Sequence, residues 1–258
     1  MGKEVLVSII MGAYNNENTI SRAIESILAQ THQNWEFIIC DDCSTDSTLQ
    51  ILEEFSKIDQ RIKVLTNAKN SKLAYSLNRC LEYCNGEFVA RMDADDISKN
   101  SRISKQLDFL QSNLDIDLVG SNAYVDSGTG EYGVRMVKEV PTKEDIIYGP
   151  TFIHPSVMFR KKAILDIGGY TVSNRTFRGQ DWDLWFKFFA NELKAYNIQE
   201  YLLIYSEPKE AAKKRTFFGS VALSKTAFWG FKKLNVPLWK YPIALKPVVS
   251  FFIKKFFF

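Results

Sequence analysis

FVARMDADDI, from Phe88 to Ile97, is the stretch that decides the fold. A mostly apolar run ends at Met92, and three carboxylates follow within four positions, at Asp93, Asp95 and Asp96. This pattern predicts a buried strand whose carboxyl end opens into a cleft, where open α/β sheets bind ligands. Clustered carboxylates repel one another, and a divalent cation that prefers oxygen ligands is a common reason to group them. A solvated acidic turn is the alternative interpretation.

Strand and helix signals alternate before this stretch. Val5–Met11 is a nearly continuous apolar run, typical of a strand buried on both faces, and apolar residues at helical spacing follow within 20–28. Further strands are predicted at residues 36–40, 62–65 and 88–92. Because strands that alternate with helices form parallel sheets with right-handed crossovers, we expect an α/β domain of the nucleotide-binding type.

The pattern becomes less regular beyond Ile97. A helix is expected around 103–110, and a second helix at 161–167 is closed by glycine. Short strands are predicted at residues 117–125, 134–140 and 156–159. We therefore expect the sheet to continue, with less regular connections.

The composition is that of a globular protein. With 258 residues and 46% apolar content, the chain can form one large domain, or one domain with an appendage. The four cysteines all lie in the first third, which does not suggest a disulfide framework. No segment reaches the roughly 20 apolar residues of a membrane span, and residues 5–11 carry no signal-peptide cleavage pattern. We expect a soluble body in a reduced, cytosolic setting.

The last fifty residues differ from the rest in charge. Residues 209–258 hold eleven Lys and Arg against one Glu, so of the overall net charge of +3 they carry +10 and residues 1–208 carry −7. Prolines break this basic, aromatic segment into short helices, which we predict to lie in a membrane interface with Lys toward anionic headgroups. Two alternatives are nucleic acid, which the acidic body disfavours, and a packed C-terminal helical subdomain.

Polar loops follow three of the predicted strands. They are MGAYNNE at Met11–Glu17, DDCSTD at Asp41–Asp46 and DADD at Asp93–Asp96. Because the carboxyl ends of parallel strands meet at one edge of a sheet, we expect the three loops to form one site.

These loops, with GGY at 168–170 and GQDWDLWFKF at 179–188, resemble the family 2 glycosyltransferases over about residues 5–205. The resemblance implies a GT-A, Rossmann-like fold in residues 1–208 and an inverting transferase for a nucleotide-diphosphate sugar, with a UDP-sugar expected first. It also implies a hydroxyl acceptor, lipid-linked or saccharide, in the synthesis of a surface polysaccharide. With the basic segment, this leads us to expect a cytoplasmic protein, peripheral on the inner face of the cell membrane, with no nucleic-acid partner.

The resemblance also assigns roles to single residues. Asp181 is implied as the catalytic base, and Asp95 as the ligand of a Mn²⁺ or Mg²⁺ ion that bridges the diphosphate. A cation would stabilise charge on the leaving diphosphate, and an acceptor hydroxyl must lose its proton to a nearby group. A helix N-cap is the alternative for Asp181, and Asp183 is its rival as the base. The implied donor contacts are Ala13, Tyr14, Glu17, Asp41, Asp42 and Asp93.

Four residues depart from the family pattern: Gly12 replaces a usual Pro, Cys43 and Lys72 replace common glycines, and Gln180 replaces the Glu before the base. None removes a carboxylate that the assignment needs. Gln180 does remove a negative charge beside Asp181, which would lower the pKa of that carboxyl.

Other metal ligands are conceivable. Cys40 and Cys43, with Cys80 and Cys84, could be read as a zinc site, although buried free cysteines fit the pattern better. His154 is either a structural histidine or a further contact to metal or acceptor.

Two other classes of protein fit parts of the sequence. A sugar nucleotidyltransferase has a similar fold but carries a glycine-rich, Arg-containing loop after its first strand, which Gly12–Glu17 does not match. A noncatalytic membrane-surface interaction protein would need neither Asp95 nor Asp181.

Overall fold

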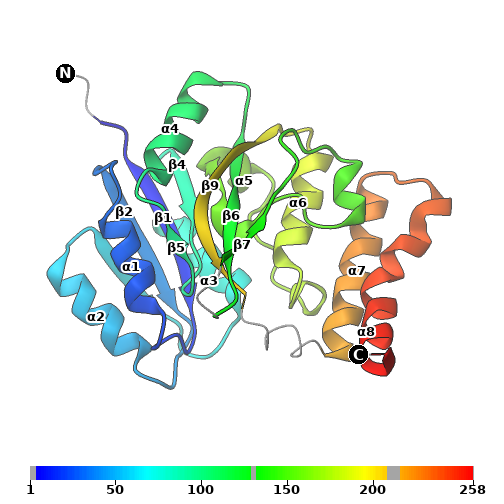
Figure 1. The fold of residues 1–258 in the computed structure, drawn as a ribbon, viewed down its shortest axis with the longest axis horizontal. Coiled ribbons are helices and arrows are strands. Elements are labelled where there is room, and N and C mark those ends of the chain that lie inside the picture. The colour runs from blue at the N-terminus through cyan, green and yellow to red at the C-terminus, as the bar shows by residue number, and fades with distance from the viewer. Residues whose placement is uncertain (1–3, 129–131, 208–215, 258) are drawn as a thin grey trace.

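One sheet of nine strands runs through the part of the chain that this computed structural model describes, residues 4–128, 132–207 and 216–257 (Figure 1). The strands are β1 (Val7–Ala13), β2 (Trp35–Asp41), β3 (Ile62–Thr66), β4 (Phe88–Arg91), β5 (Ile97–Ser98), β6 (Leu118–Asp126), β7 (Tyr132–Arg135), β8 (Met158–Arg160) and β9 (Ala195–Ser206). The α-helices are α1 (Ile20–Leu28), α2 (Thr48–Ile58), α3 (Leu73–Tyr83), α4 (Arg102–Ser112), α5 (Lys161–Asp166), α6 (Gln180–Ala190), α7 (Phe217–Lys233) and α8 (Lys246–Phe257). Short 3₁₀ helices are η1 (Asp145–Tyr148), η2 (His154–Ser156), η3 (Asn174–Thr176) and η5 (Leu238–Leu245).

The strand order is β3-β2-β1-β4-β8-β6-β9-β5, with β7 paired to β6 off this path. The first four strands along that order are parallel, and Ala13 at the end of β1 lies beside Asp41 at the end of β2. β4 pairs antiparallel with β8 and β6 pairs parallel with β9, so the second half is mixed. The predicted parallel half-sheet and its common polar edge are confirmed.

Both faces of the sheet are covered by helices, as a parallel sheet requires. Successive strand residues point to opposite faces, so Ile10 and Ile38 pack in the cluster with α3 and α6, whereas Ile9 and Phe37 pack in the cluster with α1 and α4. The nearly continuous apolar runs of β1 and β2 are explained by this two-sided burial.

Two of the predicted strands are wrong in part. β7 ends at Arg135 instead of continuing to residue 140, because the next backbone groups bond elsewhere: Val137 N donates to Asn122 Oδ1 at 2.9 Å, and Glu139 O accepts from Asn197 N at 2.7 Å. At the predicted strand 156–159 the chain first makes η2, which contains Pro155, and β8 begins only at 158. β5 and the twelve-residue β9 were not predicted.

The C-terminal helix α7 packs on the body beside α6 (Figure 1). Ala227 and Phe231 of α7 are fully buried, and Thr226 Oγ1 donates to Arg175 O at 2.8 Å. The alternative of a packed C-terminal helical subdomain therefore holds for α7, and α8 packs along α7. The predicted boundary at 208/209 lies outside the described residues. Within the described ranges, no helix has both the length and the hydropathy of a membrane span.

Candidate active site

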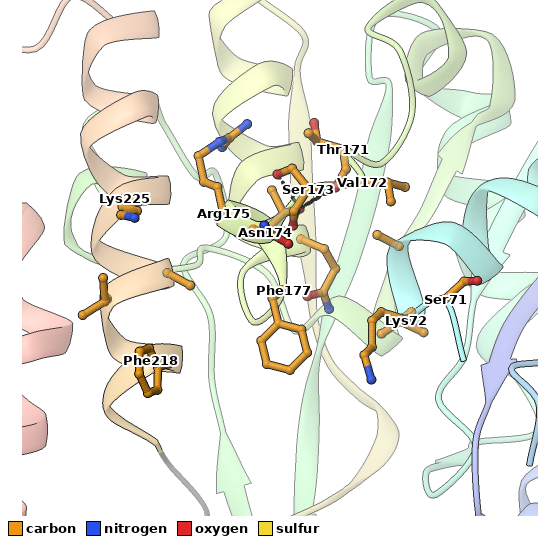
Figure 2. A pocket seen from close by; sticks show the side chains of 16 residues that line it. Ser71, Lys72, Thr171, Val172, Ser173, Asn174, Arg175, Phe177, Phe218 and Lys225 are labelled. Carbon is orange, nitrogen blue, oxygen red and sulfur yellow. Dashed lines mark hydrogen bonds between the residues drawn. The ribbon is translucent and has the colours of Figure 1, made fainter. Parts of the chain in front are cut away.

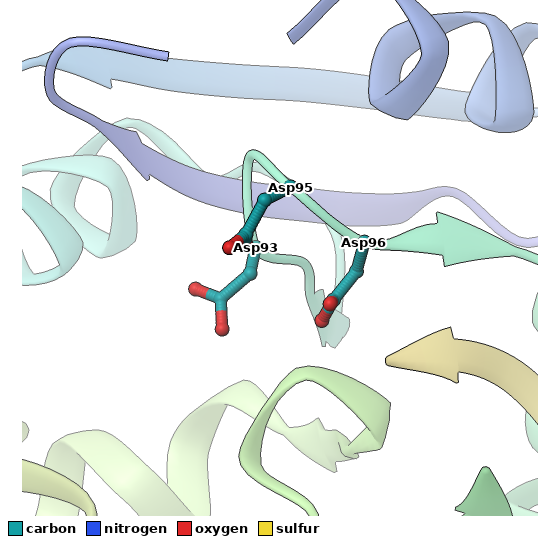
Figure 3. Close-up of side chains that lie close together, drawn as sticks. All are labelled: Asp93, Asp95 and Asp96. Atoms are coloured by element: carbon teal, nitrogen blue, oxygen red, sulfur yellow. The ribbon is translucent and has the colours of Figure 1, made fainter. Parts of the chain in front are cut away.

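The acidic loop after β4 brings three carboxylates together (Figure 3). Asp93, Asp95 and Asp96 each offer an oxygen, and these oxygens lie within 4.8 Å of one another. Burial, with the charge of Asp93 beside it, raises the pKa of Asp95 to about 6. The solvated acidic turn is thus excluded, because Asp96 is fully buried and Asp93 and Asp95 are partly buried.

Asp96 is fixed by the sheet rather than by its own loop. Its Oδ1 accepts a hydrogen bond of 2.8 Å from the backbone N–H of Ser206, at the end of β9, and its Oδ2 has no partner among the described residues. Burial first, and then the charges of Asp93 and Asp95, raise the pKa of Asp96 well above its ordinary value. The sequence contains Asp96 in the decisive stretch, but only the fold reveals its distinct environment.

Two buried arginines lie beneath these carboxylates. Arg91, the last residue of β4, is 1% exposed and forms an ion pair with Asp93. Arg102 is fully buried, donates to Arg91 O at 2.7 Å and to Val157 O at 3.2 Å, and has its pKa lowered by burial to about 9. Buried charges require partners, so these arginines offset the repulsion among the carboxylates. Sequence reasoning missed them, although an arginine in an apolar strand was the available signal.

The acidic loop fits a divalent cation on three observations. All three side chains offer carboxylate oxygens, the ligand type that Mg²⁺ and Mn²⁺ prefer. Their oxygens are close enough to share one ion, and Asp96 Oδ2 is buried without a hydrogen-bond donor among the described residues. These residues can therefore accommodate a divalent cation, and the presence of the metal stays a prediction.

The loop after β1 joins this edge from the neighbouring strand. Ala13 is buried, and its carbonyl accepts from Asp42 N at 2.8 Å, while Tyr14 is 44% exposed. Glu17 is exposed, and its Oε2 accepts from Ser47 N at 3.1 Å next to α2. Ala13 and Tyr14 are thus available at the edge, whereas the carboxylate of Glu17 already bonds to the chain.

Asp41 and Asp42, after β2, are both buried and organise their surroundings. Asp42 accepts from Asn67 Nδ2 at 2.7 Å, from Ser71 N at 2.7 Å and from Lys72 N at 2.8 Å, which ties β2 to the start of α3. Asp41 accepts from the hydroxyl and the backbone N–H of Ser44. Donor binding by these two residues remains a prediction.

The departures from the family pattern have visible geometry. Cys43 and Lys72 have φ values of 62° and 72°, in the left-handed region that glycine adopts readily, which accounts for the glycines expected there. A Cβ at Gly12 would lie 2.7 Å from Leu73 Cδ1, so a larger residue here would require the Leu73 side chain to shift.

Asp181 lies on the other side of the site, as the second residue of α6. The N-cap of this helix is Gly179, so the N-cap interpretation of Asp181 is wrong. Burial raises the pKa of Asp181 above its ordinary 3.8, and the nearby charge of Asp93 adds to the shift. Asp181 also lines a cavity of about 540 Å³ together with Trp182 and Tyr205. A partly buried carboxylate with a raised pKa, facing a cavity, has the properties of a general base.

Asp183, the rival, faces the protein interior. It is fully buried in the first turn of α6 and forms an ion pair with Arg175, whose guanidinium lies 4.1 Å from the ring centroid of Trp229. This environment supports the first-turn structural role for Asp183.

The cysteines and His154 have structural surroundings. Cys40, Cys80 and Cys84 are buried and Cys43 is exposed, all as free thiols, and within the described ranges they form no metal-binding group. His154 is buried with its Nε2 2.8 Å from the hydroxyl of Tyr170, and burial lowers the pKa of the imidazole well below its usual range. A neutral, hydrogen-bonded histidine is the simpler interpretation.

The sheet has a parallel half with a polar carboxyl edge, an acidic loop follows β4, and a carboxylate lies on helix α6. These features define the class: this is the GT-A fold of glycosyltransferases. The sequence model of the family described as "Glycosyl transferase family 2" matches residues 8–168. The chain belongs to the family 2 glycosyltransferases.

Individual relatives agree with this membership. EpsE of Bacillus subtilis (strain 168) is 38% identical over 248 residues, which cover 96% of this chain and 89% of EpsE. The UDP-Gal:alpha-D-GlcNAc-diphosphoundecaprenol beta-1,3-galactosyltransferase of Escherichia coli is 32% identical over 217 residues, or 81% of this chain and 76% of the relative. The crystal structure of S. aureus TarS 1-349 in complex with UDP shares the fold, with a TM-score of 0.70 at 20% identity over 98% of this chain and 72% of that one.

Proposed function

We propose that this glycosyltransferase moves a sugar from a nucleotide-diphosphate sugar, by preference a UDP-sugar, to a hydroxyl of a lipid-linked or saccharide acceptor, with inversion at the anomeric carbon. The observation that carries the proposal is the pairing of a buried carboxylate cluster at the sheet edge with a second carboxylate, Asp181, whose pKa responds to the charge of Asp93. The donor class is supported by the name of the E. coli relative, and surface-polysaccharide synthesis by its lipid-linked acceptor.

The donor would lie along the carboxyl edge of β1, β2 and β4. Ala13 and Tyr14 would lie beside the nucleobase. Asp42, with Asp41 near it, would contact the nucleobase, and Asp93 would approach the ribose. Asp42 also fixes the start of α3 next to the site, because it accepts hydrogen bonds from the backbone N–H groups of Ser71 and Lys72. For Glu17 we propose the weaker, indirect role of holding the loop through Ser47.

Asp95 would ligate Mn²⁺ or Mg²⁺, with Asp93 and Asp96 beside it. A bound dication would act as a Lewis acid that stabilises the charge on the departing diphosphate. The residues of this chain contribute a preformed group of oxygens, held by Arg91 from below and by the N–H of Ser206 from the side. The arginines make it possible to keep three carboxylates together before any ion binds.

Asp181 would accept the proton of the acceptor hydroxyl as its oxygen attacks the anomeric carbon. The new bond forms between the acceptor oxygen and that carbon, the bond from the carbon to the diphosphate oxygen breaks, and the nucleoside diphosphate leaves with the electron pair. Because attack and departure occur on opposite faces of the carbon, the configuration inverts. A raised pKa suits this task, since it strengthens the carboxylate as a base.

The C-terminal helices would also associate with the inner face of the membrane. Several apolar side chains on them are exposed, among them Phe218 at 84%, Leu238 at 80% and Trp239 at 75%. Lys232 and Lys233 are exposed in the same segment. Aromatic side chains with lysines suit an anionic lipid surface, where each Lys contributes about 1 kcal/mol.

The experiment that tests this function is donor hydrolysis. Purified protein is incubated with a panel of nucleotide sugars with and without Mn²⁺, and release of the free nucleotide is followed. We expect one UDP-sugar to be turned over only with the metal. No release from any donor, in the presence of saccharide acceptors as well, would contradict the proposal.

A further inference from the structure

Two cavities flank the start of α6, and only one of them contains the candidate base. The larger, of about 880 Å³, lies between the start of α3, the 171–177 loop and α7. Lys72, Phe177 and Lys225 are among the residues that line it (Figure 2). Among the described residues, no carboxylate lines it. The smaller, of about 540 Å³, is lined by Asp181 and is of ordinary size for a ligand pocket.

The smaller cavity is also joined to the acidic loop. Tyr205 lines it and directly precedes Ser206, whose backbone N–H donates a hydrogen bond of 2.8 Å to Asp96 of that loop. A molecule in this cavity would therefore lie beside the candidate base and near the end of β9, which helps to hold the acidic loop, and this position suits an acceptor hydroxyl.

Two cations enter the same cavity, Arg178 from the loop before α6 and Lys246 from the start of α8. Both side chains are exposed, and neither pairs with a carboxylate in the part of the chain that the structure describes. Arg175, by contrast, is already paired with Asp183 beside the larger cavity. Among the described residues, Asp181 is the only carboxylate that lines the smaller cavity, so the cavity can accommodate an anionic group away from that residue.

The C-terminal helices build the remaining wall and connect it to an aromatic surface. Leu223 of α7, with Ile243 and Pro247 from η5 and α8, provides apolar lining. Two rim residues, Thr216 and Ser250, directly precede Phe217 and Phe251, whose ring centroids are 5.8 Å apart. The aromatic end of the α7–α8 pair thus lies next to the lining residues of the cavity.

We propose that this cavity is the acceptor site, and that Arg178 and Lys246 bind the diphosphate of a lipid-linked acceptor whose chain leaves over Phe217 and Phe251. The proposal rests on the proposed function, because it takes Asp181 as the base. Arginine and lysine are the residues that bind phosphate oxygens through charge-assisted hydrogen bonds, and the apolar wall suits a hydrocarbon chain. A neutral saccharide would use the cavity without these two contacts.

The test measures binding of farnesyl diphosphate to full-length protein saturated with UDP and Mn²⁺, so that the donor site is filled. Lys246→Met and Arg178→Met should each raise Kd about tenfold, the usual scale for losing a hydrogen bond to a charged group. Lys246→Arg should restore most of the affinity, and farnesol should bind weakly to all variants. Lys225→Met, in the larger cavity, is the matched control and should leave Kd unchanged.

Several results would overturn the proposal. If Lys225→Met binds farnesyl diphosphate more weakly and Lys246→Met binds it as the wild type does, the acceptor lies in the larger cavity. If all variants are folded, as their melting temperatures would show, and all bind farnesyl diphosphate equally, the two cations do not bind the acceptor. If farnesol binds as tightly as farnesyl diphosphate, the diphosphate is not recognised. Metal-dependent donor hydrolysis by the wild-type protein separates these failures from failure of the proposed function, since that reaction needs no lipid-linked acceptor.

Discussion

Gly230 of α7 faces the ring of Phe186 of α6 so closely that a Cβ on the glycine would overlap the aromatic carbons. The backbone of α7 is therefore in van der Waals contact with α6 at this position, so the two helices pack closely and are not held together by a few long side chains alone. Alanine has a higher helix propensity than glycine, so a loss of stability on replacing Gly230 with alanine would report the packing against Phe186 and not the helix propensity.

Gly230→Ala should lower stability by about 1 to 3 kcal/mol, the usual cost of overpacking a filled core. The expected drop in melting temperature is several degrees for a domain of this size. Lys232→Ala on the exposed side of the same helix is the control and should change little. A stabilised Gly230→Ala variant would show that α7 is not packed as described.

Asp95→Asn should abolish turnover and remove the Mn²⁺ dependence of UDP binding, because a neutral amide is a weaker ligand for a hard dication. Calorimetric titration of UDP with and without the metal measures this directly. Asp166→Asn removes an exposed carboxylate that pairs with Lys162; this variant is the control and should bind UDP as the wild type does. If metal-dependent binding persists in Asp95→Asn, the ion has other ligands.

Asp181→Asn should leave UDP and metal binding intact while kcat falls by roughly 10² to 10⁴, the contribution of a positioned general base. The wild-type enzyme should lose turnover as pH falls, because only the ionised Asp181 accepts a proton and its pKa lies above 3.8. A rate profile at saturating donor and metal measures this. An equal loss of UDP affinity in Asp181→Asn would indicate a structural role instead.

Glu36 should make folding sensitive to acid at a place remote from the site. Burial would raise the pKa of this carboxyl, but Lys63 at 2.8 Å and hydrogen bonds from Asn85 and Ser8 outweigh it and lower the pKa to about 2. The folded state thus binds the proton more weakly than the unfolded state.

The resulting stabilisation is present above the unfolded pKa of 4.5 and is lost as pH falls toward 2. Its size at neutral pH is on the order of 3 kcal/mol. Glu36→Gln should show less of this acid sensitivity in urea unfolding curves, whereas Glu53→Gln on the exposed face of α2 should match the wild type. Identical pH profiles for all three proteins would refute the assignment.

The membrane proposal is tested by point variants rather than truncation, since removing α7 would expose the buried Phe231. Phe218→Ser and Trp239→Ser should each reduce sedimentation with anionic liposomes at low salt. Leu114→Ser, which replaces a residue that is 80% exposed after α4, is the matched control. Equal losses in all three variants, or in none, would count against a specific lipid-facing surface.

The parallel half of the fold could be predicted from sequence because each strand has its own local signature. β1 and β2 are apolar on both faces, and polar loops follow them directly. β9 could not be predicted in the same way: its residues 196–201 include polar and charged side chains that are partly exposed, and its length is set by pairing with β6. Edge and mixed strands depend on partners distant in sequence, which local patterns do not contain.

The site shows the same division. Asp93, Asp95 and Asp181 could be proposed because their motifs are local. Their electrostatic setting could not, because it depends on Arg102, on Ser206 and on the burial that the assembled sheet creates. The cavity wall from α7 and α8 was also beyond sequence reasoning, which placed these residues in a membrane interface.

The hydrogen bond from Ser206 to Asp96 joins residues 110 positions apart. During synthesis the ribosome adds residues at about 5–20 per second, so the acidic loop emerges several seconds before the strand that completes it. Throughout that interval a nascent chain carries its acidic loop without the backbone donor of β9. The amino-terminal half can form its parallel strands early, yet the finished arrangement of carboxylates belongs to the last stage of biogenesis, after β9 has left the exit tunnel.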